Sequence, residues 1–199
     1  MPLPKSDARW IAGFRSKYAE WWPEARALLE GHQYVAAFKA YPWPSFDSSP
    51  WVPVLKPLDR SRLAVVTTGG LYRPGLDAPF ESQALEGDWS YRALSRPVNL
   101  SRLAIAHLHF PHEVAQADMN AIFPLDRLTE LEESGIIGDL APTHYSMMGF
   151  CTRADEVAEK TAQVGACALP PREHAGRAGE PREADGRVAC RVRGVGSDQ

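Results

Sequence analysis

Short apolar strands alternate with amphipathic helices in the middle of the chain, and this alternation constrains the fold most. Residues 63–67 are typical of a buried strand that runs into the turn Thr67-Thr68-Gly69-Gly70, and residues 103–110 indicate a second strand. Residues 124–134 have the apolar spacing of a helix with proline at its start and glycine after its end, and residues 155–164 predict another. We therefore expect an α/β fold with a Rossmann-like, mostly parallel sheet.

Aromatic residues are concentrated before this alternation. Trp10, Phe14 and Trp21 recur near helical spacing within residues 6–40, and Pro23 is well placed to open a second helix. Residues 41–60 are rich in proline, which removes backbone donors and favours extended geometry. The sequence therefore predicts a helical aromatic arm and connector over residues 1–60, followed by an α/β domain over residues 61–165.

The composition changes after about residue 166. The last part of the chain is rich in Ala, Arg, Gly, Pro and Glu and has no aromatic residue, so we expect a disordered tail over residues 166–199. In an α/β chain the helix at 155–164 should lead to another buried strand, and none follows. Two explanations stay open: a natural divergent end, or a reading-frame shift near codon 165, because GC-rich DNA read out of frame gives this composition.

Charge and cysteine usage exclude several classes of protein. The net charge of -3 and pI near 6.1 give no electrostatic basis for binding nucleic acid. There is no apolar run of the roughly 18–20 residues that a transmembrane helix needs, and the first residues do not form a secretory signal. The three cysteines are odd in number and widely spaced, which predicts neither a disulfide framework nor a zinc site and favours the cytoplasm.

The segment Gly87-Asp88-Trp89-Ser90-Tyr91-Arg92 carries a carboxylate and a guanidinium four residues apart. Asp88 and Arg92 could form a structural pair. Alternatively, the planar guanidinium of Arg92 could hold the carboxylate of a small substrate.

His107-x-His109-x-x-His112 is the most metal-like pattern in the sequence. Strand alternation would place His107 and His109 on one face, and Glu113 or Asp118 could add a carboxylate ligand. The other interpretations are polar groups in a substrate pocket, or structural histidines with satisfied hydrogen bonds. We expect substrate contact from these histidines and no metal site.

Cys151 directly precedes the predicted helix that begins near residue 155. A cysteine close to a helix N-terminus and beside Arg153 can have a depressed pKa, which would make its thiol reactive. The alternative is an isolated cysteine without a redox role.

These segments occur in an order that resembles the B-component (selenoprotein B) family of the glycine, sarcosine, betaine and D-proline reductases. The resemblance rests on TTGGLY at 67–72, GDWSYRAL at 87–94 and the segment 119–150 that contains FPLDRL and THYSMMGF. It implies an α/β subunit that works with a pyruvoyl-containing partner, which activates an amine substrate while a thiol or selenol cleaves the α C–N bond reductively. No selenocysteine is written in this sequence.

The resemblance also implies a place for the redox motif. Cys167 falls roughly where the family has Sec-x-x-Cys or Cys-x-x-Cys, although here Cys167-Ala168-Leu169-Pro170 lacks the second cysteine. The resemblance therefore predicts an oligomeric redox subunit with Cys151 and Cys167 as candidate thiols. It further implies a small amino acid or amine substrate, a thiol donor and no bound cofactor. A non-catalytic interaction subunit of the same fold, or a metal-dependent enzyme that uses His107 and His109, are the alternatives.

Overall fold

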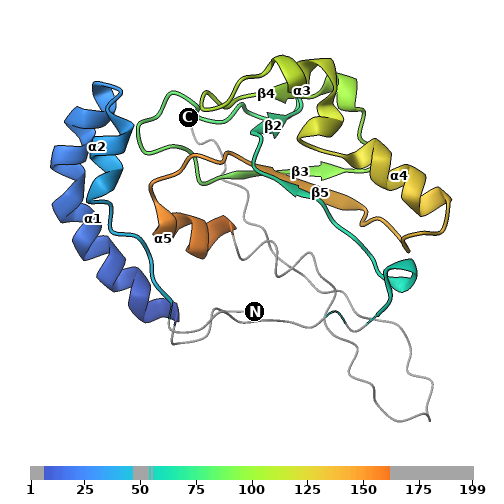
Figure 1. Cartoon of the computed structure of the whole chain (residues 1–199), viewed down its shortest axis with the longest axis horizontal. Helices are drawn as coiled ribbons and strands as arrows, with labels where there is room; N and C mark the ends of the chain where they lie inside the picture. The colour runs from blue at the N-terminus through green and yellow to red at the C-terminus, as the bar shows by residue number, and fades with distance from the viewer. Residues whose placement is uncertain (1–6, 47–53, 55, 162–199) are drawn as a thin grey trace, which may run out of the picture.

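A computed structural model describes residues 7–46, 54 and 56–161 (Figure 1). The helices and strands, in chain order, are α1 (Asp7–Glu30), α2 (Tyr34–Lys39), β1 (Val66–Thr67), β2 (Leu71–Tyr72), β3 (Tyr91–Ser95), β4 (Ala104–Ile105), α3 (Glu113–Ala117), α4 (Leu125–Glu133), β5 (Thr143–Met147) and α5 (Ala154–Glu156), which continues as a π-helical turn (Val157–Thr161). None of the helices in these ranges is long and apolar enough to cross a membrane.

The main sheet has the strand order β1-β5-β3 and is mixed rather than mostly parallel. β1 runs parallel to β5, with Val66 opposite Tyr145, whereas β3 runs antiparallel to β5. A parallel connection needs a crossover, usually a helix. The helices α3 and α4 lie between β1 and β5, whereas the described chain between β1 and β3 has no helix. The α/β class expected from the sequence is confirmed, but a mostly parallel sheet is not what the described strands form.

The second predicted strand is much shorter than residues 103–110. Only Ala104–Ile105 form β4, which pairs antiparallel with β2, and the chain bends after it. The period-two argument therefore does not apply to His107 and His109, because both lie beyond the strand. The first predicted strand is better confirmed, since the Leu63 amide donates to the Asp139 carbonyl before β1 begins.

The helix predicted at 124–134 is confirmed. The one predicted at 155–164 is the short α5 and its π-helical turn Val157–Thr161, and its last three residues lie outside the described ranges. α4 begins after Pro124 and ends before Gly135, whose φ of 71° closes the helix as expected. Pro23, however, lies inside α1 instead of opening a second helix. The break comes later, around His32, because aromatic residues before Pro23 and the aliphatic Ala25 and Leu29 after it pack in one cluster.

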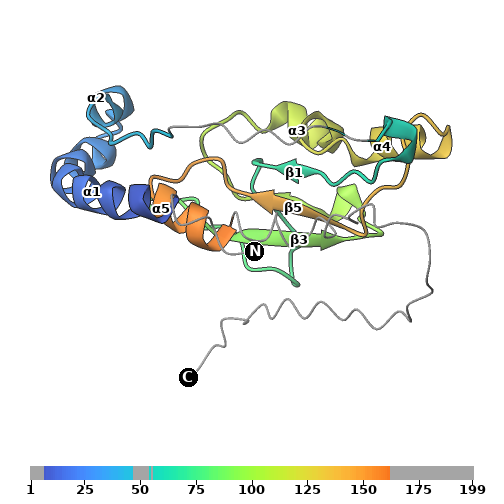
Figure 2. The same cartoon turned by 90° about the horizontal axis from the view of Figure 1, so that it is seen from below.

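Two hydrophobic clusters stabilise the fold. The arm cluster is built from α1, α2 and the residue that follows them: Phe14, Tyr18, Trp21, Ala25, Leu29, Ala37 and Tyr41. The body cluster lies between the sheet and the α3–α4 layer: Leu71, Leu94, Leu100, Leu103, Phe123, Leu125, Ile137 and Leu140. In Figures 1 and 2 the arm stands at one end of the sheet, and α5 lies between the arm and the strands. The predicted disordered tail, including Cys167, lies outside the described residues.

Candidate functional site

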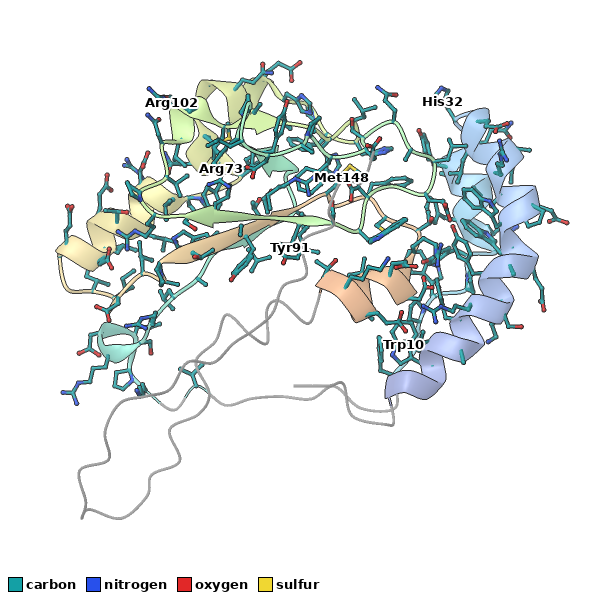
Figure 3. The ribbon with its side chains drawn as sticks, turned by 180° about the vertical axis from the view of Figure 1, so that it is seen from behind. Trp10, His32, Arg73, Tyr91, Arg102 and Met148 are labelled. Carbon is teal, nitrogen blue, oxygen red and sulfur yellow. The ribbon has the colours of Figure 1, made fainter. Side chains whose placement is uncertain are left out.

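The carboxyl ends of β1 and β5 lie at the arm-facing end of the body, where several of the motif segments converge. Gly69 forms a bridge with Met148, and the Gly70 amide donates to the Met147 carbonyl at 2.9 Å. A Cβ on Gly149 would lie 3.1 Å from His107 Nε2. Figure 3 shows Met148 at the end of the sheet nearest the arm. In α/β folds, ligands bind outside the carboxyl ends of parallel strands.

The Gly87-Asp88 segment reaches the same place. Gly87 forms an antiparallel bridge with Cys151 and has a φ of 78°. A Cβ at Gly87 would collide with the Phe150 carbonyl oxygen and lie 2.8 Å from the Cys151 Cα. The chain therefore comes this close to residues 150–151 only because residue 87 is glycine.

Asp88 is buried and organises its own loop. Its carboxylate accepts from the Glu81 amide at 2.9 Å and from the Ser90 amide at 2.6 Å, and it also accepts from the Ser90 hydroxyl. Asp88 borders a cleft of about 340 Å³ between α1 and residues 81–89, which Trp22 and Trp89 also line. The cleft is large enough for a small organic molecule.

Arg92 lies on β3, with its guanidinium over the loop that precedes it. It donates to the carbonyls of Ala78 and Pro79 and to the Ser90 hydroxyl, and it stacks 4.1 Å from the centre of the Phe80 ring. Asp88 and Arg92 are thus joined through Ser90 instead of forming a direct ion pair. This geometry favours the structural interpretation of Arg92, and its contact with a substrate carboxylate stays a prediction.

His107 is buried beside the Gly149 segment. Its Nδ1 accepts from the His109 amide at 3.1 Å, so the neutral ring carries its proton on Nε2. Burial lowers the pKa of His107, and the neighbouring His109 and His112 lower it further. His109 stacks 4.2 Å from Phe150, and burial lowers its pKa as well. Both rings are therefore neutral at pH 7, although β4 does not place them on a common strand face.

The structure does not assemble the predicted carboxylate-supported metal pattern. Asp118 caps the turn Met119–Ala121 by accepting from the Asn120 amide, and Glu113 opens α3. Across the residues that the structure describes, no group of three or more His, Cys, Asp or Glu could hold a metal ion. The described residues therefore give no support to a metal-dependent role of His107 and His109.

The Cys151 thiol is partly buried, and its pKa is shifted in the direction opposite to that expected. Burial raises the pKa of Cys151 to about 11, and the charges of Asp88 and Asp155 act in the same direction. Arg153 lowers it only in part, because its guanidinium is paired with Asp155 at 2.9 Å and Glu156 at 3.1 Å. The thiol is therefore protonated at neutral pH.

Residues that sequence reasoning missed connect the arm to this segment. Thr152 and Asp155 are fully buried, and arm side chains bind both. Arg15 Nε lies 2.8 Å from Asp155 Oδ2, and the Tyr41 hydroxyl donates to the Thr152 carbonyl at 2.7 Å. The only local signal was the Arg153-x-Asp155 pair, because the partners of these residues lie more than a hundred positions away.

Asp155 makes the stability of the arm junction pH-dependent. The arm junction is the contact of Arg15, Tyr18 and Tyr41 with Thr152 and Asp155. Burial alone would raise its pKa, but the hydrogen bonds from Arg153 and Arg15 outweigh burial and lower it to about 2. Because the folded pKa lies below the unfolded value, the contribution is present above about pH 4 and is lost as the pH falls towards 2. A shift of this size corresponds to about 2 kcal/mol at neutral pH.

We therefore expect Asp155→Asn to lower the free energy of unfolding by about 2 kcal/mol at pH 7, and by about half as much at pH 3. Urea unfolding at the two pH values measures the difference. Asp139→Asn is the control, because its side chain is 74% exposed and its pair with Arg62 should contribute little. A deficit of equal size at both pH values would contradict the assignment of a charged, buried Asp155.

The fold and the site define a small α/β domain whose loop segments gather at the carboxyl ends of a parallel strand pair. A family model described as glycine/sarcosine/betaine reductase selenoprotein B matches residues 27–170, which is more than half of the chain. The chain therefore belongs to this family, as the order of its motifs predicted. The match begins within α1, so it includes part of the arm.

Curated relatives are subunits of reductase complexes. The chain is 31% identical over 122 residues to a glycine reductase complex component B subunit gamma of Symbiobacterium thermophilum, covering 61% of this chain and 28% of the relative. It is 30% identical over 99 residues to a D-proline reductase subunit gamma of Acetoanaerobium sticklandii, covering 50% and 39%. A betaine reductase complex component B subunit beta of Peptoclostridium acidaminophilum is 31% identical over 129 residues, covering 62% and 28%.

The chain thus spans between 28% and 39% of the length of these relatives. No solved structure matches it.

Proposed function

We propose that this chain is a redox subunit of a reductase complex that cleaves the α C–N bond of a small amino acid or amine. The observation that carries the proposal is the convergence of four segments on one end of the body. The turn at 67–70, the segment at 87–88, His107 and residues 147–151 all meet there, and all lie inside the family match. The parallel β1–β5 pair supports a Rossmann-like arrangement of this part of the subunit.

The proposed chemistry needs two electrons, two protons and an activated substrate. A pyruvoyl group on a partner subunit would activate the amine. A dithiol donor would supply the electrons and end as a disulfide, while the nitrogen leaves as the protonated amine. The cleft beside Asp88 and the neutral His107 and His109 are the polar surroundings that this chain offers to such a substrate. A reducing cytoplasm would keep the thiols available.

Two cysteines are candidates for the thiol. Cys167 lies within the family match but outside the described residues. Cys151 lies at the convergent segments, and burial raises the pKa of its thiol to about 11, so a more exposed thiol would be more reactive.

The raised pKa of Cys151 also favours the alternative, a non-catalytic interaction subunit of the same family. In that case the chain would contribute binding surface to the complex, and electron transfer would occur on another subunit. The two functions differ in whether a cysteine of this chain is required.

Thiol variants in the reconstituted complex distinguish them. The chain is combined with a pyruvoyl-containing partner subunit and a dithiol donor. Release of ammonia or amine is measured with glycine, sarcosine and betaine, and formation of the ring-opened linear amino acid is measured with D-proline. A redox subunit predicts that Cys151→Ser or Cys167→Ser lowers the rate at least about 100-fold, while Cys190→Ser does not. Full activity of both serine variants would support the interaction subunit and contradict the redox role.

A further inference from the structure

Three arm side chains reach across the junction and bind the segment that follows Cys151. The Tyr41 hydroxyl donates to the Thr152 carbonyl at 2.7 Å, and the Tyr18 hydroxyl lies 2.8 Å from the Thr152 hydroxyl. Arg15 binds the carboxylate of Asp155 at 2.8 Å. These contacts join α1 and Tyr41, which follows α2, to residues that lie more than a hundred positions later. They therefore form only when the arm is docked on this segment.

Every polar atom of Thr152 has a hydrogen-bond partner. Its amide donates to the Glu86 carbonyl at 2.8 Å, its carbonyl accepts from Tyr41, and its hydroxyl lies between Tyr18 and Glu86. The side chain of Thr152 is completely buried. Cys151 directly precedes Thr152, and its own backbone is bridged to Gly87, so the backbone that carries the thiol is fixed on both sides while Thr152 stays in place.

The two tyrosine side chains are buried in the arm cluster. The position of their hydroxyls therefore depends on the docking of the arm. Burial is the main reason that the pKa of Tyr41 is raised to about 12, and burial also raises the pKa of Tyr18. Both hydroxyls therefore stay protonated and able to donate at any physiological pH. Ring contacts with Phe14 and Trp21 fix both tyrosines within the arm.

We propose that the arm controls access to the Cys151 thiol: Tyr18 and Tyr41 are positioning residues that hold Thr152 and keep the Cys151 thiol partly buried, and undocking of the arm exposes it further to small electrophiles. The exposed species would be a thiol that a partner, a disulfide or an alkylating reagent can reach. This proposal concerns access and holds whether or not Cys151 is the redox thiol of the complex.

The test measures the alkylation rate of Cys151 with iodoacetamide at pH 8 in the full chain. Cys167→Ser and Cys190→Ser leave Cys151 as the single thiol. In that background Tyr41→Phe and Tyr18→Phe each remove one hydrogen bond to Thr152, which should raise the rate about fivefold each. The double variant should react about 25-fold faster if the two contacts act independently. Tyr72→Phe, on β2 in the other sheet, is the matched control and should leave the rate unchanged.

The urea dependence of the rate separates arm undocking from global unfolding. Undocking exposes little surface, so the logarithm of the rate should rise with urea much less steeply than the global unfolding equilibrium does. Wild-type rates in the Tyr41→Phe, Tyr18→Phe and double variants would overturn the proposal. So would an increase whose urea dependence equals that of global unfolding, because the tyrosines would then act only on overall stability. Amine release by the complex tests the proposed function separately.

Discussion

Gly87→Ala is expected to lower the free energy of unfolding by about 3 kcal/mol, one of the two largest effects that the structure predicts for a single substitution. Two costs combine at this position. Alanine is strained at the φ of 78°, and its Cβ would collide with the Phe150 carbonyl oxygen. The obstructing atoms belong to the backbone, so relief requires that residues 150–151 move away from residue 87.

Gly75→Ala is the matched control for this prediction. Gly75 has nearly the same φ, 79°, but a Cβ there would have no atom within 4 Å. The strain alone should then cost about 1 kcal/mol. Urea unfolding gives the free energy of unfolding of both variants, and the difference between them measures the steric cost at Gly87. Equal losses would contradict the packing of the Gly87 segment against Cys151, and with it the convergence of the motif segments.

Phe123→Ala is expected to lower the free energy of unfolding by about 3–5 kcal/mol. Phe123 is the largest fully buried side chain, and it lies in the body cluster with its ring centre 6.0 Å from that of His144. Its loss would leave a cavity beside His144, a β5 residue whose Nδ1 accepts from the Val65 amide at 3.0 Å. We therefore expect the substitution also to weaken the pairing of β1 with β5, which positions the site.

Thermal or urea unfolding measures this effect, with Leu76→Ala as the control. Leu76 is 78% exposed, so its removal should change the free energy of unfolding by no more than about 0.5 kcal/mol. If Phe123→Ala and Leu76→Ala were equally stable, the body cluster would not be the core that stabilises the sheet.

Local sequence signals correctly predicted the elements whose structure depends only on residues nearby in the chain. The start of α4 after Pro124, its apolar face and its end at Gly135 all depend on residues within a few turns of one another. The position of Pro23 inside α1 shows the limit of the same reasoning. The proline signal for a helix start is local, and the packing of the arm cluster on both sides of Pro23 overrides it.

Strand direction and the environment of Cys151 depend on contacts that are distant in sequence. The antiparallel pairing of β3 with β5 joins residues about fifty positions apart, which alternation of apolar residues does not encode. The expected low pKa of Cys151 relied on the nearby helix start and Arg153. Burial, together with the charges of Asp88 and Asp155, raises it instead. Asp88 and Arg92 were found from their motif, but their link through Ser90 required the structure.

The most direct test of the central claim, that the chain is a subunit of a reductase complex, is its assembly with the partner. The tagged full chain is co-expressed with a pyruvoyl-containing subunit, and the mass of the purified species is measured in solution. The account predicts a stoichiometric complex that forms with the wild type and weakens in Gly87→Ala, which disturbs the convergent segments, but persists in Gly75→Ala. A chain that folds stably yet stays separate from the pyruvoyl-containing subunit would contradict it.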